Sequence, residues 1–228
     1  MSPTPSIRAL YDLWAPSYLP APHNPLMRVE QAAMLRLLPP AAGLHALDLA
    51  CGTGRYTRIL AAHGAAAITS LDFSMPMLRR VRSVETQDIA SLLCGSMLDL
   101  PLPAAAFDLV VSGLAVGHAP DLHRWLAEAA RVLRPGGALL YSDFHPFAKQ
   151  AGWQRTFRDP GGATRAVPFH AHEPAAHAAA ARALGLRLET LEELRVGVEL
   201  TEAFPGSRDF YRRWRGKPII LVALLRKA

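Results

Sequence analysis

The residues with the clearest chemical meaning form a glycine turn between an apolar segment and a helical one. Residues 46–54 read Ala-Leu-Asp-Leu-Ala-Cys-Gly-Thr-Gly, which predicts a buried strand that ends in a turn at Gly52, Thr53 and Gly54. Glycines let backbone N–H groups approach a ligand closely, and the positive end of the following helix favours an anionic group. The turn therefore predicts a binding site for a ligand that carries such a group.

A second acidic position favours a ligand that contains a nucleoside. Asp72 ends the next predicted strand, where a carboxylate can accept hydrogen bonds from both hydroxyls of a ribose. A glycine turn alone is weak evidence, because nicotinamide and flavin enzymes use such turns too. The turn in this sequence differs from their G-x-G-x-x-G pattern, since Thr57 replaces the third glycine and the acidic Asp48 stands four residues before Gly52.

Two histidines follow predicted strands at the sheet edge where ligands of open α/β sheets bind. His118 follows the strand predicted over residues 107–112, and His145 follows the strand predicted over residues 138–142. Histidine is suited to act as a base at neutral pH. We predict that His145, oriented by Asp143, or else His118 is the base or a substrate anchor; a structural role in a loop is the alternative for both.

A proline- and glycine-rich stretch after the fifth strand offers further polar groups. Arg155 and Arg158 flank Phe157, and their guanidinium groups could clamp a carboxylate or phosphate, with solvated arginines as the alternative. His170 and His172 form an H-x-H pair, but no cluster of acidic or cysteine side chains accompanies them, so no metal site is predicted. The predicted substrate-binding residues are Trp14, Tyr18, His118, His145, Arg158 and His170.

Short apolar runs alternate with helical stretches, which predicts parallel strands joined by crossover helices. Strands are predicted over residues 44–50, 66–72, 89–94, 107–112, 138–142, 186–194 and 218–225. Helices are predicted over residues 7–17, 25–38, 54–63, 75–84, 121–133 and 175–184. We expect an α/β fold with a doubly wound, Rossmann-like, seven-stranded sheet, mostly parallel and with an antiparallel strand in its C-terminal hairpin.

The 228 residues are predicted to form a single domain. Half of them are hydrophobic and 19% are charged, a composition that excludes a disordered or fibrous chain. Residues 1–40 are expected to supply cap helices. Residues 143–174 lack clear periodicity and are expected to form an irregular lid or substrate-binding insertion.

Composition also limits location and partners. Two cysteines, no signal peptide and no apolar run of membrane length favour a cytoplasmic protein that does not bind a membrane. Residues 205–228 account for the whole net charge of +6. Such a basic segment can attract nucleic acid or an acidic partner, but no recognition motif accompanies it, and a solvated terminal helix and strand is the favoured explanation, so no nucleic acid is predicted.

The glycine turn resembles motif I of the class I S-adenosylmethionine-dependent methyltransferases, hh[DE]hGxGxG. The resemblance continues in the same order through four more blocks, at residues 71–78, 95–101, 107–110 and 127–137. It implies S-adenosylmethionine as cofactor and a small-molecule acceptor methylated on oxygen, nitrogen or carbon. A catalytically silent cofactor-binding protein that uses its lid for a partner is the alternative.

Carried over residue by residue, the resemblance implies a cofactor site in which Asp72 binds the ribose and Phe73 packs beside the adenine. Asp48 would either organise the turn or reach the cofactor through water. The stretch Gly95-Ser96-Met97 departs from the common G-D-A, and Ser96 leaves only a neutral hydroxyl at the adenine position. The implied cofactor-binding residues are Tyr11, Tyr18, Asp48, Ala50, Gly52, Thr53, Gly54, Asp72, Phe73, Ser96, Met97 and Leu114.

Residues 11–18, Tyr-Asp-Leu-Trp-Ala-Pro-Ser-Tyr, resemble the YDxxAxxY signature of small-molecule methyltransferases. This group includes the ubiquinone and menaquinone C-methyltransferases and the carrier-protein O-methyltransferase of biotin synthesis. The resemblance implies helices that cover the cofactor, and an acyl carrier protein as one candidate partner of a monomer or homodimer. An aromatic face packed on the core is the alternative for Tyr11, Trp14 and Tyr18.

Overall fold

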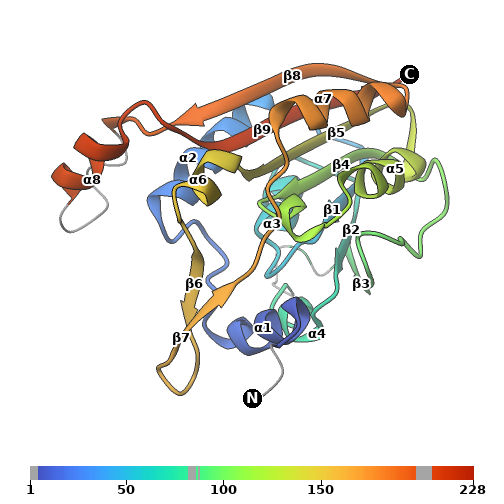
Figure 1. The fold of residues 1–228 in the computed structure, drawn as a ribbon. Helices are drawn as coiled ribbons and strands as arrows, with labels where there is room; N and C mark the ends of the chain where they lie inside the picture. Colours follow the sequence, from blue (N-terminus) through green and yellow to red (C-terminus); the bar gives the residue numbers. More distant parts are fainter. Residues whose placement is uncertain (1–4, 82–85, 87, 199–206) are drawn as a thin grey trace.

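The computed structural model describes residues 5–81, 86, 88–198 and 207–228, and its main element is a seven-stranded sheet (Figure 1). The strands are β1 (His45–Leu49), β2 (Ala67–Asp72), β3 (Ala90–Cys94), β4 (Phe107–Gly113), β5 (Leu133–Phe144), β8 (Leu186–Arg195) and β9 (Pro218–Lys227). Their order is β3-β2-β1-β4-β5-β9-β8, with β1 to β5 parallel and β9 antiparallel to both of its neighbours. The predicted fold class, including the antiparallel C-terminal strand, is confirmed.

Helices surround this sheet, and several begin at a residue that caps the free N–H groups of the first turn. The helical segments are α1 (Ile7–Trp14), η1 (Ala15–Ser17), α2 (Pro25–Leu37), α3 (Arg55–Ala62), α4 (Met75–Leu78), η2 (Val116–His118), α5 (Leu122–Val132), α6 (Pro146–Gln150), α7 (Pro174–Ala183) and α8 (Ser207–Trp214). Asn24 caps α2, Ser74 caps α4 and Asp121 caps α5, each by accepting a backbone N–H three residues on.

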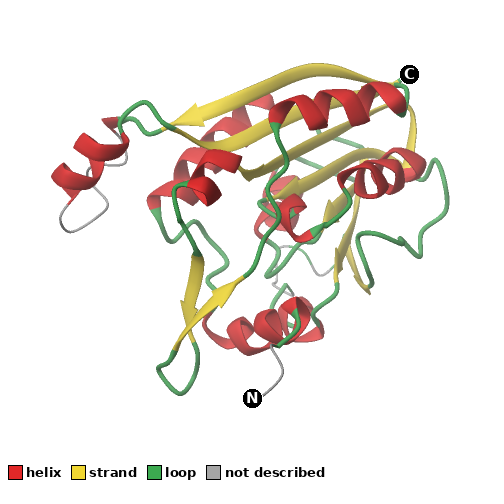
Figure 2. Ribbon diagram, viewed as in Figure 1, coloured by secondary structure: helices red, strands yellow, loops and turns green. Residues whose placement is uncertain are grey.

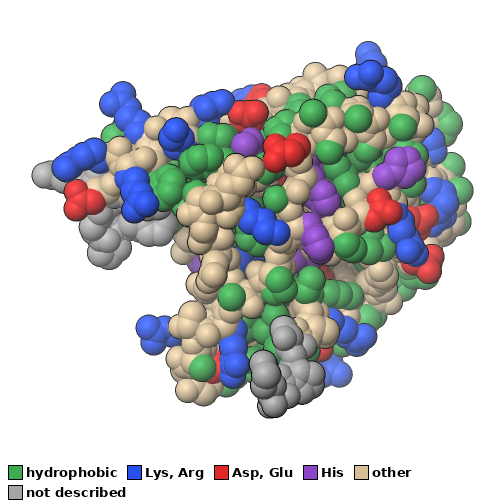
Figure 3. Space-filling model, in the orientation of Figure 1, with side chains coloured by type: hydrophobic (Ala, Val, Ile, Leu, Met, Phe, Trp, Pro, Cys, Tyr) green, Lys and Arg blue, Asp and Glu red, His purple; other side chains and the backbone are tan. Residues whose placement is uncertain are grey.

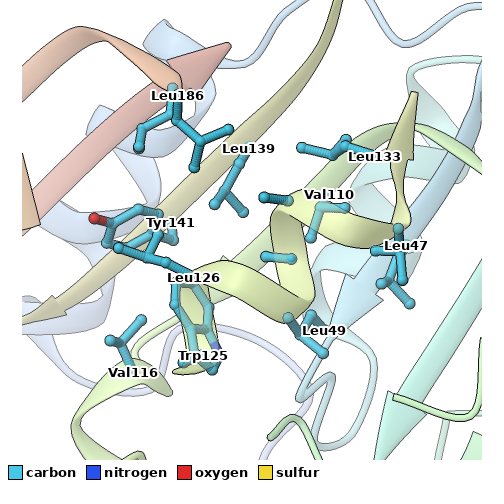
Figure 4. Close-up of a cluster of buried hydrophobic side chains, with 14 of the residues drawn as sticks. Leu47, Leu49, Val110, Val116, Trp125, Leu126, Leu133, Leu139, Tyr141 and Leu186 are labelled. Carbon is cyan, nitrogen blue, oxygen red and sulfur yellow. The ribbon is translucent and has the colours of Figure 1, made fainter. Parts of the chain in front are cut away.

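Both faces of the sheet are covered, because successive strand residues point to opposite sides. Figure 2 shows helices in front of the strands and behind them. Trp125 and Leu126 of α5 pack with Leu49, Leu139 and Tyr141 on one face (Figure 4). On the other face, a second cluster joins Met34 of α2 and Leu60 of α3 to side chains of β1, β4, β5 and β9. The two clusters leave the carboxyl ends of the parallel strands free to form a site.

The segment after β5 is more regular than we predicted. It contains α6 and an antiparallel hairpin of β6 (Arg155–Arg158) and β7 (Thr164–Val167), instead of an irregular loop. Each hairpin strand has four residues with one buried side chain, so its sequence shows too little alternation to be recognised. The helix predicted over residues 75–84 is also shorter, since α4 ends at Leu78; residues 82–85 lie outside the described residues.

The hairpin packs against the N-terminal helix. Leu10 of α1 forms a buried cluster with Phe157 and Val167, and the Trp14 ring stacks on the Phe157 ring with centroids 4.8 Å apart. Figure 1 shows α1 beside the hairpin, below the main sheet. Segments separated by more than 100 residues thus close the same side of the molecule.

The basic C-terminal region forms α8 and β9, which agrees with the prediction of a terminal helix and strand. Arg212, Arg213 and Arg215 are exposed, and Figure 3 shows Lys and Arg side chains over the α8 end of the molecule. Among the described residues, none of the helices has both the length and the apolar character needed to cross a membrane.

We predict that Gly54→Ala destabilises the fold more than a matched change at Gly43. Both glycines have a left-handed backbone, with φ of +80° and +75°, but a Cβ at Gly54 would lie 2.7 Å from Cγ1 of Val81, whereas nothing lies within 4 Å of one at Gly43. Strain and overlap together should lower the free energy of unfolding by about 2–4 kcal/mol. Strain alone at Gly43→Ala should cost about 1–2 kcal/mol. Equal losses in chemical denaturation would contradict the packing argument.

Candidate functional site

A cavity lies at the carboxyl ends of β1, β2 and β4, beside the point where the strand order reverses. It encloses about 1030 Å³ of space, part of it open to solvent. The lining residues are Ile7, Tyr11, Tyr18, Leu19, Met27, Asp48, Ala50, Cys51, Gly52, Thr53, Arg55, Tyr56, Leu71, Asp72, Phe73, Gly95, Ser96, Met97, Leu98, Gly113, Leu114, Ala115, His118 and Arg155.

The floor of the cavity is the turn after β1. Ala50, Gly52 and Gly54 all have positive φ, of 60°, 55° and 80°, so the chain reverses sharply before α3 begins. The Cys51 N–H donates to the Leu71 carbonyl at 2.9 Å, which fixes the turn to the end of β2. Thr53 is buried, and its hydroxyl has no hydrogen-bond partner in the described part of the chain. The turn therefore holds, beside the cavity, a buried polar group without a partner among the described residues.

Asp72 is held at one wall by backbone donors. Its carboxylate accepts hydrogen bonds from the N–H groups of Gly52 and Ser74, both at 2.8 Å. Burial raises the pKa of Asp72 to about 6, although these two N–H groups favour the ionised form. The carboxylate is thus oriented before any ligand arrives, and its remaining lone pairs are available to hydroxyl donors.

Asp48 has a different environment, because its carboxyl group lies against α3. The Thr57 hydroxyl donates to its Oδ2 at 2.7 Å and also contacts the Ser70 hydroxyl at 2.8 Å. Burial raises the pKa of Asp48 to about 6. Thr57, the residue that replaces the third glycine of the dinucleotide-binding pattern, therefore has a physical role, because its hydroxyl satisfies this buried carboxyl.

Sequence reasoning missed a buried carboxylate behind the cavity, that of Glu30 on α2. Glu30 is fully buried and accepts hydrogen bonds from Arg55 at 2.6 Å, Tyr56 at 2.7 Å and Ser142 at 2.6 Å. Arg55 and Tyr56 themselves line the cavity. The available signal was a charged residue on the apolar face of α2, since Met27, Glu30 and Met34 follow helical spacing.

At the opposite wall, one arginine joins three segments of the chain. Arg155 of β6 donates from Nη1 to the Tyr11 hydroxyl at 2.6 Å and from Nη2 to the Leu114 carbonyl at 2.8 Å. Its Nη1 also lies 2.6 Å from Nε2 of His118, and the Tyr11 hydroxyl lies 2.7 Å from the same nitrogen. Because arginine only donates, Nε2 of His118 is an acceptor and the ring proton belongs on Nδ1.

These contacts keep His118 neutral. Burial, followed by the charge of Arg155, lowers the pKa of His118 to about 3. Burial likewise raises the pKa of Tyr11 to about 12. Both side chains are uncharged near pH 7, and the one acceptor nitrogen of His118 is already engaged.

The structure does not bring His145 to this cavity. His145 caps α6, where its Nδ1 accepts the Phe147 N–H at 3.1 Å, and its Nε2 lies 3.8 Å from a Glu193 oxygen. Asp143 is buried, and no hydrogen bond or ion pair recorded among the described residues joins its carboxyl to the His145 ring. Burial raises the pKa of Asp143 to about 7.

The other predicted site residues divide between two groups. All the predicted cofactor-binding residues except Gly54 line the cavity, and Gly54 instead begins α3 against Val81. The Ser96 hydroxyl accepts the Leu98 N–H at 3.1 Å. Trp14 lines a second cavity beside the first, whereas Arg158 and His170 are exposed and line neither. Within the described ranges, no three His, Cys, Asp or Glu side chains are placed to hold a metal ion.

Comparisons with known proteins agree with the sheet and the turn. Residues 47–141, which include the turn and most of the cavity wall, match a family model described as a methyltransferase domain. A crystal structure of an S-adenosylmethionine-dependent methyltransferase from Mesorhizobium loti is 25% identical, with a TM-score of 0.72, and the match covers 87% of this chain and 98% of that one.

Curated relatives carry more specific names. The chain is 36% identical over 117 residues to the malonyl-acyl-carrier-protein O-methyltransferase of Pectobacterium atrosepticum, covering 51% of this chain and 45% of the relative. It is 34% identical over 147 residues to the demethylmenaquinone methyltransferase of Lactiplantibacillus plantarum, covering 59% and 61%. The chain thus spans about half the length of the curated relatives it matches.

We predict that Glu30→Gln lowers the free energy of unfolding by about 3 kcal/mol or more, because it leaves the nearly buried Arg55 without its counter-charge. The matched change Glu192→Gln, on β8, removes the partner of Arg36 in an exposed ion pair at the end of α2, and it should cost at most about 1 kcal/mol. Urea denaturation of both variants measures the difference. A loss at Glu30 no larger than that at Glu192 would show that this network does not hold α2 in place.

Proposed function

We propose that this chain is a class I S-adenosylmethionine-dependent methyltransferase, which transfers a methyl group from S-adenosylmethionine to a small-molecule acceptor; the matching methyltransferase-domain model, the similar curated methyltransferases and the similar methyltransferase structure support this. The observation that supports this proposal best is the cavity itself, which joins the glycine turn and Asp72 at the carboxyl edge of the sheet. Open α/β sheets bind ligands at this edge, beside the point where the strand order reverses.

The residues of the cavity fit the cofactor. The unpartnered Thr53 hydroxyl and the positive-φ backbone of the turn offer polar groups for its amino acid end. Asp72 would accept hydrogen bonds from the ribose hydroxyls, and Phe73 and Met97 would supply apolar surface for the adenine. When bound, S-adenosylmethionine supplies an electrophilic methyl carbon on a sulfonium. The protein's task is then to orient the acceptor and exclude water.

The geometry favours catalysis by positioning over catalysis by a histidine base. A base needs a free acceptor atom and a pKa near the working pH. His118 has neither, because its Nε2 contacts Tyr11 and Arg155 and its pKa lies at about 3. We therefore assign His118 a positioning role, holding the Tyr11 hydroxyl and the Arg155 guanidinium at the cavity, and we assign His145 a role as the cap of α6.

A carrier-bound acceptor is a second candidate. The Pectobacterium atrosepticum relative is named for a malonyl group on an acyl carrier protein. Exposed Arg212, Arg213 and Lys217 at the C-terminal end could attract an acidic carrier.

We also propose that the protein works in the reducing cytoplasm. Its two cysteines, Cys51 and Cys94, are free thiols, which supports this location.

Binding of S-adenosylhomocysteine should depend on pH through Asp72. Because the pKa of Asp72 is raised to about 6, its carboxyl is mostly protonated at pH 5 and mostly ionised at pH 7. Ribose hydroxyls donate to the ionised form, so the affinity should rise by about tenfold over this interval. Asp72→Asn should weaken binding at pH 7 by roughly 1.5–3 kcal/mol and remove the pH dependence. Calorimetry that finds the same affinity at both pH values in the unmodified protein would exclude this role.

Methyl transfer itself is tested with labelled S-adenosylmethionine and a mixed metabolite extract, read by mass shift. We expect a methylated product; binding of the cofactor without any product would favour the silent alternative.

Once an acceptor is known, His145→Ala should keep near-normal kcat, and His118→Ala should lower kcat by about tenfold. Loss of a base would instead cost about 10²–10⁴-fold, and such a loss in His118→Ala would overturn the positioning role.

A further inference from the structure

A second cavity adjoins the first and differs from it in chemistry. Five aromatic side chains come together around it from α1, the following turn, the end of β5, and the segments flanking the β6–β7 hairpin. Its lining residues are Trp14, Tyr18, His23, Asn24, Leu26, Met27, Leu114, Phe144, Trp153, Gln154, Arg155, Thr156 and Phe169. Tyr18, Met27, Leu114 and Arg155 line both cavities, so the two spaces share one wall.

The aromatic rings form flat surfaces around the cavity. The Phe144 and Phe169 rings lie 5.6 Å apart between centroids, and the Trp14 and Tyr18 rings lie 4.8 Å apart. The Arg155 guanidinium lies over the Phe144 ring, 4.6 Å from its centroid. Faces of this kind bind planar, apolar groups by burial and by offset or edge contacts.

Arg155 is the one permanently charged side chain among the described residues that line this cavity. Its hydrogen-bond partners, the Tyr11 hydroxyl, His118 and the Leu114 carbonyl, are all neutral. Asp143 acts on it only at longer range, and no carboxylate of the described chain lies within ion-pair distance. Arg155 is partly buried, and a guanidinium in such a position without a counter-charge favours the binding of an anion.

The guanidinium also has free donors. Nε–H and one N–H of Nη2 find no acceptor among the described residues, since the recorded bonds use Nη1 and a single Nη2 contact. Nε and Nη2 lie on one edge of the planar guanidinium, and an edge of this kind matches the two oxygens of a carboxylate.

We propose that the acceptor of methyl transfer binds in this second cavity and is a planar aromatic molecule whose carboxylate pairs with Arg155. The inference rests on the proposed function and adds to it a location and a substrate class. Tyr18 and Leu114, which line both cavities, then lie where the acceptor meets the cofactor, so the group to be methylated must extend past them to the methyl carbon. Arg155, which contacts Tyr11 and His118 in the first cavity, would hold the carboxylate at the same boundary.

The test uses the whole protein saturated with S-adenosylhomocysteine and three probe acids: benzoate, 2-naphthoate and biphenyl-4-carboxylate. Calorimetry compares each acid with its neutral alcohol and with cyclohexanecarboxylate. At least one aromatic acid should bind more tightly than its alcohol, by about tenfold or more, and more tightly than the saturated acid. If no aromatic acid exceeds its alcohol, the carboxylate assignment is wrong. If cyclohexanecarboxylate binds equally well, the aromatic assignment is wrong.

Variants locate the site. Arg155→Gln should abolish the preference for acid over alcohol, whereas Arg165→Gln, which changes an exposed arginine on the neighbouring strand, should keep it. Phe169→Ala, which changes a residue of the second cavity alone, should weaken the binding of acids and leave the affinity for S-adenosylhomocysteine unchanged. An Arg155→Gln protein that retains the preference would overturn the proposal.

The outcomes also separate this inference from the proposed function. If S-adenosylhomocysteine does not bind, the function itself fails. If it binds and methyl transfer occurs while no probe shows the expected preference, the present proposal alone fails. Should Arg155→Gln not fold, the comparison of acids with alcohols on the unmodified protein still decides.

Discussion

A carboxylate without solvent contact must be satisfied by protein donors, and the Glu30 carboxylate is the point at which this requirement organises the molecule. Its donors come from α3 and β5, so the N-terminal helix α2 is fixed to the core by charge and hydrogen bonds as well as by apolar packing. Tyr56 is held so close to β4 that a Cβ at Gly113 would lie 2.2 Å from its ring. The back wall of the cavity is thus a consequence of one buried charge.

The floor of the cavity and the wall beside Arg155 depend on backbone conformations that residues with side chains rarely adopt. Ala50 and Leu114, at the ends of β1 and β4, have φ of 60° and 57°. Each such residue costs about 1–3 kcal/mol unless its surroundings impose the conformation. Two hydrogen bonds hold Leu114 in this conformation: its N–H donates to the Ser142 hydroxyl, and its carbonyl accepts from Arg155. The hydrogen-bond networks of Glu30 and Arg155 are therefore connected: the Ser142 hydroxyl donates to Glu30 and accepts the Leu114 N–H, and the Leu114 carbonyl accepts from Arg155.

Local spacing made the sheet, the glycine turn and Asp72 predictable, because strand, turn and helix there follow directly along the chain. The partners of Glu30 and Arg155 are 25 to 144 residues away, and no pattern within a window of sequence identifies them. His145 illustrates the opposite error: it follows a strand at the expected edge, but Pro146 begins a helix, and the histidine becomes its cap. The position of His145 along the chain predicted that it follows a strand at the ligand-binding edge of the sheet. It could not predict that the side chain caps α6 instead of lining the cavity.

The strand order has a consequence for how the chain is made. β9 is the last strand along the described chain, yet it lies inside the sheet, between β5 and β8. During synthesis, β5 and its neighbours emerge long before the strand that covers the β5 edge, and β8 has no partner in the sheet until then. Unpaired edges of this kind are templates for association between chains. A ribosome that stalls before residue 218 would therefore release a chain with two open strand edges, and we expect such nascent chains to need a chaperone.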